Sequence, residues 1–230
     1  MLELMRLEFQ KYKLGSHWKG VALALLGCML FVAACLLNNS MDATTVRYTY
    51  EDTFKATQLL LAIVFLLYAA VILATIVVGE YNNRTILVLF CYPISRRKLI
   101  LAKLLVVSLF TMVTMAVGFL CCTALAIFLD ARWDMVDGVW SMAVLMRYLP
   151  TAAVSIASCG AWCLLPFSVG MQHKSVPATV ASSILTVFAR QVIITLNPVY
   201  AETWWQYLLI LLGISVLTAV TARHQVDILD

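Results

Sequence analysis

Long apolar runs alternate with short polar stretches along this chain, and each run has about the length of a membrane-spanning helix. A helix needs about 20 mainly apolar residues to cross the hydrocarbon core of a bilayer, which is roughly 30 Å thick. The runs predict an all-α membrane protein with six transmembrane helices, at residues 20–37, 58–79, 104–129, 147–170, 178–197 and 207–222.

The composition agrees with a bilayer as the solvent for most of the chain. Of 230 residues, 63% are hydrophobic and only 12% are charged, whereas about 25% are charged in a soluble domain. Little sequence is left between the spans, so we expect one transmembrane domain over 1–230. It divides into an interfacial helix, two spans, a cytoplasmic segment, and four spans with a short tail, at residues 1–19, 20–79, 80–103 and 104–230.

The first residues mix apolar and basic side chains and are too polar to span a membrane. Leu4 and Leu7 are interspersed with cations such as Arg6. This pattern is typical of an amphipathic helix that lies in the plane of the lipid headgroups. We expect Gly15 to end this helix before the first span begins.

Lysine and arginine concentrate on one side of the predicted bundle. With the N-terminus inside, eleven lie on cytoplasmic pieces and four on outer pieces, so both termini are expected in the cytoplasm. The cytoplasmic charge would meet anionic lipid headgroups, and we do not assign it to nucleic acid. The eleven residues are Arg6, Lys11, Lys13, Lys19, Arg84, Arg96, Arg97, Lys98, Lys103, Lys174 and Arg223, and the four are Arg47, Lys55, Arg132 and Arg147.

Two polar segments are expected on the outer side. Residues 38–57 are interpreted as a solvated connection. The second segment spaces Asp130, Asp134 and Asp137 so that they could share a helix face. A cation site is conceivable there, but the alternating acidic pattern and closing Glu of a calcium loop are missing. We favour an acidic, aromatic segment at the membrane interface.

The fourth apolar run contains Pro150 and Pro166 around a stretch of small residues at 152–161. Small residues let helices approach closely, and proline within a membrane helix produces a kink. The sequence therefore predicts a kinked helix at the centre of the bundle.

The chain lacks the motifs of an enzyme. It contains no G-x-x-x-x-G-K-S/T phosphate loop, no H-E-x-x-H and no G-x-S-x-G, so it has no recognisable nucleotide, metalloprotease or serine-hydrolase site. We expect no cofactor or metal on this chain, and any ATP and Mg²⁺ would be bound by a partner. Carboxylates lie outside the predicted spans, which disfavours an ion-coupled carrier without excluding it.

Arg190 is the one charge well inside an apolar run. An intramembrane charge is by default a candidate functional residue, so Arg190 is a candidate substrate or gating contact. The interpretation we favour at this stage is structural. Because Asn197 and Pro198 end the helix two turns later, the side chain is expected to extend toward the outer surface.

The segment between the second and third runs is both charged and apolar. Pro93 divides it, since the residue before a proline avoids helical geometry. Before Pro93 a short helix can form over 80–92, in which Glu80 and Arg84 are a favourable i, i+4 pair. Its apolar face could dock into a soluble partner or rest on lipid, and local physics does not decide between the two. That face comprises Ile86, Leu87, Leu89 and Phe90.

The pattern E-Y-x-x-x-T-x-x-x-L-x-x-x-P-I-S-R at 80–96, followed by Ala102-Lys103, resembles the signature between the second and third helices of type-2 ABC transporter permeases. In that family the segment is the coupling helix that contacts the nucleotide-binding subunit. The resemblance implies this role for Glu80, Tyr81, Arg84, Thr85, Leu89, Pro93, Ser95 and Arg96.

The six-span layout and small size are similar to permeases of peptide and lantibiotic export or immunity systems. The resemblance implies a permease subunit in the bacterial cytoplasmic membrane that acts with a second permease copy or sister chain and two P-loop ATPase chains. Alternating access would move a hydrophobic or amphipathic peptide or antibiotic along a path near the first, second and fifth helices. Two alternatives are a non-transporting membrane scaffold or sensor and an ion-coupled carrier.

Overall fold

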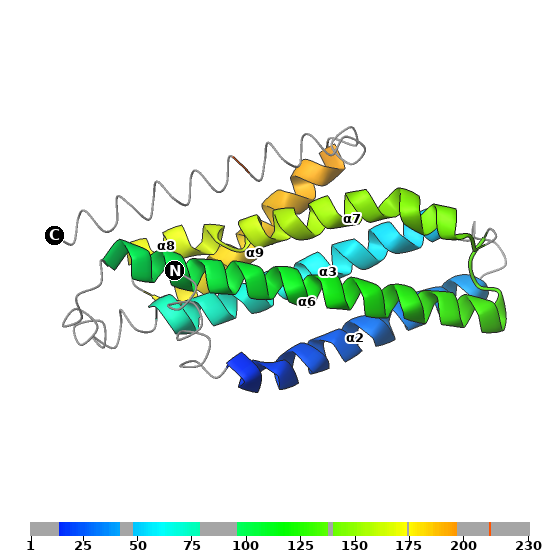
Figure 1. Cartoon of the computed structure of the whole chain (residues 1–230), viewed down its shortest axis with the longest axis horizontal. Helices are drawn as coiled ribbons and strands as arrows, with labels where there is room; N and C mark the ends of the chain where they lie inside the picture. The colour runs from blue at the N-terminus through cyan, green and yellow to red at the C-terminus, as the bar shows by residue number, and fades with distance from the viewer. Residues whose placement is uncertain are drawn as a thin grey trace.

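The computed structural model describes residues 14–41, 48–78, 96–137, 140–173, 175–196 and 212, and these residues form a bundle of helices (Figure 1). Apart from an isolated bridge between Thr49 and Asp137, the described residues contain no strand. The elements are α2 (Leu14–Met41), α3 (Tyr50–Leu73), the π-helix η1 (Ala74–Val78), α6 (Arg96–Trp133), α7 (Met142–Trp162), α8 (Leu165–His173) and α9 (Val176–Leu196).

Five helices in the described part of the chain are long and apolar enough to cross a membrane. They correspond to the first five predicted spans. The sixth predicted span at 207–222, all but the end of the interfacial helix at 1–19, and the coupling segment at 80–95 lie outside the described residues. The five spans are Trp18–Asn38, Tyr50–Ile76, Ile100–Trp133, Met142–Phe167 and Val176–Ile193.

Two predicted boundaries are wrong. Gly15 does not end a helix, because α2 begins at Leu14 and continues through it; glycine inside a helix costs about 1 kcal/mol relative to alanine but does not prevent helix formation. The predicted outer connection at 38–57 is too long, because α3 already begins at Tyr50. A capping box between Thr49 and Asp52 starts this helix, in which the Thr49 side chain accepts from the Asp52 N–H.

The predicted spacing of Asp130, Asp134 and Asp137 on one helix face is a third expectation that the structure contradicts. Helix α6 ends at Trp133, and Asp134 adopts a φ of 50°, which turns the chain out of the helix. Asp130, Asp134 and Asp137 therefore do not share a helix face.

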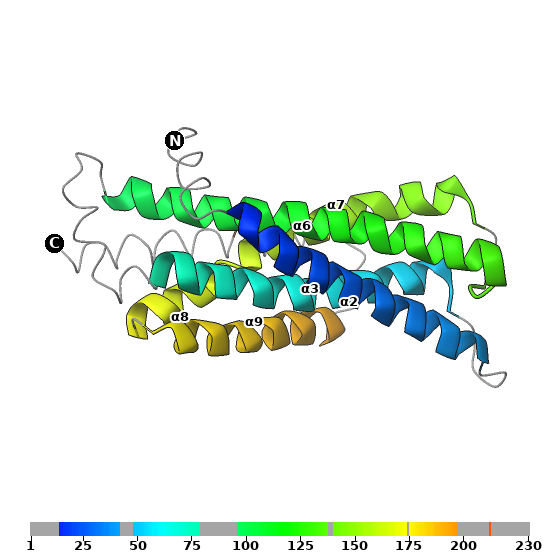
Figure 2. The same ribbon diagram turned by 90° about the horizontal axis from the view of Figure 1, so that it is seen from below.

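Helix α3 is the centre of the described bundle. It contacts α2, η1, α6, α7, α8 and α9, and the two perpendicular views show helices on several sides of it (Figures 1 and 2). The small residues of α7 had predicted that this helix, and not α3, lies at the centre of the bundle. The large apolar side chains of α3 explain the difference, because Phe54, Leu61 and Phe65 are at most 1% exposed and fill the interior.

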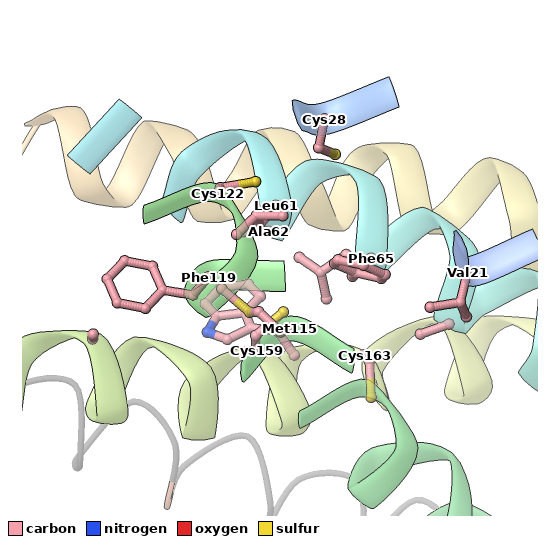
Figure 3. Close-up of a cluster of buried hydrophobic side chains, with 14 of the residues drawn as sticks. Val21, Cys28, Leu61, Ala62, Phe65, Met115, Phe119, Cys122, Cys159 and Cys163 are labelled. Carbon is pink, nitrogen blue, oxygen red and sulfur yellow. The ribbon is translucent and has the colours of Figure 1, made fainter. Parts of the chain in front are cut away.

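The core joins α3 to α6 and α7 (Figure 3). Leu61 and Phe65 lie near Met115 and Phe119, with Cys159 close by. Gly118 allows α6 to approach, because a Cβ there would lie 3.0 Å from Leu61 Cδ2. Cys28, Cys122, Cys159 and Cys163 are free and buried, so they act as small apolar side chains.

The predicted interruption of the fourth run is confirmed at Pro166, whereas Pro150 lies inside α7. Helix α7 stops at Trp162, residues 163–164 form a turn, and α8 begins at Leu165, next to Pro166. The absence of an N–H on proline explains why the α-helical ladder does not continue there. Helices α8 and α9 then meet at a tight corner, where a Cβ on Gly170 would collide with Thr179.

Candidate functional site

Most of the predicted coupling residues lie outside the described residues. Only Arg96 falls in a described element, as the first residue of α6. The joint that leads into this segment is described, however, because α3 continues directly into η1 and ends at Val78.

The joint is a π-helix, which is rare and often occurs at functional positions. Thr75 Oγ1 donates to the carbonyls of Val71 and Ile72, at 3.0 and 2.9 Å. η1 contacts α6, α8 and α9 as well as α3. The turn at which the described part of α3 ends is therefore in contact with four helices.

Arg190 lies inside the bundle. It is 7% exposed, and its Nη2 donates to Ser155 Oγ on α7 at 3.3 Å. At 1.5 Å per residue, it is about 21 Å along α9 from Val176, within a core roughly 30 Å thick. The expectation that this side chain extends to the outer surface is wrong, because it crosses to α7.

The electrostatic setting of Arg190 is unusual. No carboxylate in the described segments forms an ion pair with it, and its described hydrogen-bond partner is the neutral Ser155. A charge in a low-dielectric interior is costly without an opposite charge. The arrangement therefore fixes a positive charge between α9 and α7.

A second polar contact lies two helical turns from Ser155 along α7. Tyr148 donates from its hydroxyl to Gln58 Oε1 on α3, at 2.9 Å. Both side chains are buried, and Gln58 Nε2 has no hydrogen-bond partner among the described residues. Tyr148 and Ser155 thus place two polar contacts, to α3 and to α9, on α7.

In α9 the exposed face is apolar and the buried face is polar, the reverse of a surface helix in a soluble protein. Its most exposed large side chains are apolar, Leu185 at 71% and Phe188 at 65%, as expected for a surface in contact with lipid. Its buried face is polar, and each hydroxyl donates to a carbonyl three or four residues earlier on the same helix or in the residue before it. The buried polar residues are Thr179, Ser182, Ser183, Thr186 and Arg190.

A third polar cluster closes the end of the bundle at which α3 begins, which we call the Tyr50 end. Tyr50 donates its hydroxyl to Asp130 Oδ2, and Asp130 Oδ1 accepts from the Val136 N–H at 2.9 Å. The Asp137 N–H donates to the Tyr48 carbonyl at 3.1 Å. These contacts join the start of α3 to the end of α6.

Sequence reasoning identified Arg190 but not its partners. Ser155, Gln58 and Tyr148 stand in apolar runs, where serine and tyrosine are ordinary, and only the fold brings them together. The capping pattern Thr49-x-x-Asp52 was a usable signal for the start of α3, and it was missed. In the ranges that the structure covers, no three His, Cys, Asp or Glu residues are grouped as a metal site.

The helical bundle and its buried polar contacts define a membrane protein of the multi-span class. Residues 4–189 match the family described as "ABC-2 family transporter protein", and the chain belongs to this family. It is also similar to "Uncharacterized protein YcbO" of Bacillus subtilis (strain 168), with 29% identity over 186 residues, which cover 81% of this chain and 82% of that protein.

Proposed function

We propose that this chain is the permease subunit of an ATP-driven transporter whose nucleotide is bound by separate P-loop ATPase chains. Membership of the ABC-2 family over residues 4–189 carries the proposal. The absence of a phosphate loop from the chain agrees with ATP and Mg²⁺ on a partner. The Tyr50 end would face outward, and the segment after η1 would face the cytoplasm.

The mechanism we propose begins in the segment 80–96. ATP-driven closure of the partner subunits would pull on this segment, and η1 would transmit the pull to α3, because the two are continuous. Since η1 also contacts α8 and α9, these helices would move with α3. Two permease chains would rock against each other and carry a hydrophobic or amphipathic peptide or antibiotic across the membrane.

Within this mechanism Arg190 acts as a gating contact. Its bond to Ser155 ties α9 to α7, and motion of α9 with η1 would strain or break that bond. The guanidinium would then stabilise one arrangement of the two helices, in the interior where a hydrogen bond to a charged group counts most.

A pull-down tests the proposal. The detergent-solubilised chain is purified from its native membrane, co-purifying chains are identified, and ATP hydrolysis is measured. We expect a P-loop ATPase that is lost on Glu80→Ala with Leu89→Asp. The matched control is Glu51→Gln, because Glu51 lies at the Tyr50 end, where the ATPase would not bind.

Each outcome of the pull-down decides between functions. A bound ATPase that is insensitive to the double substitution would move the coupling role to another segment. A partner without ATPase activity would favour the scaffold or sensor. Transport by the chain alone, with a dependence on pH or sodium, would favour the ion-coupled carrier.

A further inference from the structure

A cavity of about 160 Å³ lies between α2 and α3 near the Tyr50 end. Helix α2 crosses α3 obliquely (Figure 2), and the α3 side of the gap carries the small residues Thr53, Ala56 and Thr57. Small side chains at an oblique crossing leave space that larger ones would fill. Phe31, Val32, Cys35 and Leu36 of α2 form the opposite wall.

The cavity is apolar and open at the side of the bundle. Phe31, Cys35 and Ala56 line it and are exposed, so a molecule could enter between the helices. An apolar cavity of about 150 Å³ can hold a benzene-sized group. This cavity therefore has the size for one aromatic ring or a short branched chain.

Among the described residues, one charged side chain lines the cavity. Asp52 is exposed at the first turn of α3, and Thr49 uses only its Oδ2. Within the described ranges, Asp52 Oδ1 accepts no hydrogen bond and Asp52 forms no ion pair. The neighbouring Glu51 pairs with Arg147 instead, at 3.8 Å, and Lys55 does not line the cavity. A ring-sized apolar space beside an exposed carboxylate with one oxygen not engaged by the described residues is complementary to a cationic amphipathic molecule.

We propose that the α2/α3 cavity binds the transported compound, and that this compound carries a positive group next to an aromatic or branched apolar group. That the bound compound is the transported one rests on the function proposed above. The apolar group would enter between Ala56 and Phe31, and the positive group would lie against Asp52. This narrows the cargo from amphipathic peptides or antibiotics in general to cationic ones.

Cys35 is a natural reporter, because it is free, exposed and part of the cavity wall. The full chain is placed in lipid nanodiscs, where both faces are accessible, and Cys91→Ala and Cys121→Ala remove two further thiols from the labelling reaction. Cys35 is then labelled with cationic trimethylammonium-ethyl or anionic sulfonatoethyl methanethiosulfonate, and the two rates are normalised to those of a free thiol. No ATPase is needed, so the outcome is independent of the pull-down.

We expect the cationic reagent to react several-fold faster than the anionic one, because the Asp52 carboxylate attracts the first reagent and repels the second. Asp52→Asn keeps an acceptor for Thr49 and should bring the ratio close to one. Glu51→Gln removes the same charge one residue away, from a side chain that does not line the cavity, and should change the ratio less. Equal effects of the two substitutions, or a parent ratio near one, would overturn the proposal.

Binding is tested by protection of Cys35. Benzyltrimethylammonium should slow labelling several-fold at millimolar concentration, while benzenesulfonate, with the same ring and opposite charge, should not. Ala56→Phe should abolish protection, whereas Leu59→Phe, on the exposed side of α3 and not in the cavity wall, should retain it. Equal protection by both probes, or by neither, would show that the cavity holds lipid or nothing rather than a cationic ligand.

Discussion

The guanidinium of Arg190 on α9 donates to the hydroxyl of Ser155 on α7 across 3.3 Å, inside the bundle and without a carboxylate partner in the described segments. Thirty-five positions separate the two residues in the sequence. This contact connects α9 to α7, the helix before the kink.

The two members of this contact should respond to substitution in opposite ways. Ser155→Ala leaves a buried charge without its described acceptor and should destabilise the chain by about 1–3 kcal/mol. Arg190→Leu removes the charge and should be neutral or stabilising. Melting temperatures in a non-ionic detergent measure both effects.

The double variant provides the control for that pair. With Arg190→Leu in place, Ser155→Ala should have little further effect, because the hydroxyl no longer has a cation to accept from. If Ser155→Ala costs the same free energy in both backgrounds, the two residues are not energetically coupled.

Tyr148 and Gln58 form the second interhelical contact, and it is incompletely satisfied. Tyr148→Phe should cost about 1–3 kcal/mol, because Gln58 would then have neither amide atom paired among the described residues. Gln58→Leu should recover most of this loss in the Tyr148→Phe background, since it removes the buried amide. Denaturation in mixed micelles would measure the cycle, and no recovery would contradict the buried contact.

Gly160 should not tolerate a side chain. An added Cβ would lie 2.5 Å from Met112 Cγ, and Ser108 Oγ donates to the Gly160 carbonyl at 2.8 Å. We expect Gly160→Ala to cost about 1–3 kcal/mol by overpacking. Gly27→Ala is the matched control, because nothing lies within 4 Å of a Cβ there, and helix propensity should make it slightly stabilising. Equal thermal stability of the two variants would contradict the close approach of α6 and α7.

The Asp130 carboxylate should hold the turn that follows α6. Asp130→Ala removes the acceptor of the Val136 N–H and of the Tyr50 hydroxyl. Hydrogen exchange at Val136 should become faster by about 10- to 150-fold, as expected when a hydrogen bond to a charged acceptor, worth about 1.5–3 kcal/mol, is lost. Glu51→Gln breaks only an exposed ion pair and should leave that exchange rate almost unchanged.

Much of the architecture could be predicted because length and apolarity decide what crosses a membrane. Five spans and the break near Pro166 follow from these properties and from the missing N–H of proline. The early start of α3 was missed because charge at Glu51 and Asp52 indicated a solvated loop. Their acidic side chains in fact suit the first turn of a helix, where the N–H groups are free.

The site was harder to predict because it depends on which helix faces meet. The apolar run identified Arg190 as unusual, but its direction depends on the acceptor at Ser155. In the same way, Thr53, Ala56 and Thr57 look like ordinary small residues until α2 crosses them at an angle and leaves a cavity. Pairings between distant segments are not visible in the periodicity of either segment alone.

The hydroxyl groups on the buried face of α9 have a mechanical consequence. Because Thr179, Ser182, Ser183 and Thr186 all bond to carbonyls within or directly before their own helix, a translation of α9 along α3 exchanges none of these bonds. Resistance to such a shift comes from side-chain packing and from contacts to other helices, such as the hydrogen bond from Arg190 to Ser155. Helix α9 can therefore slide along its neighbour without losing the hydrogen bonds of its four buried hydroxyl groups.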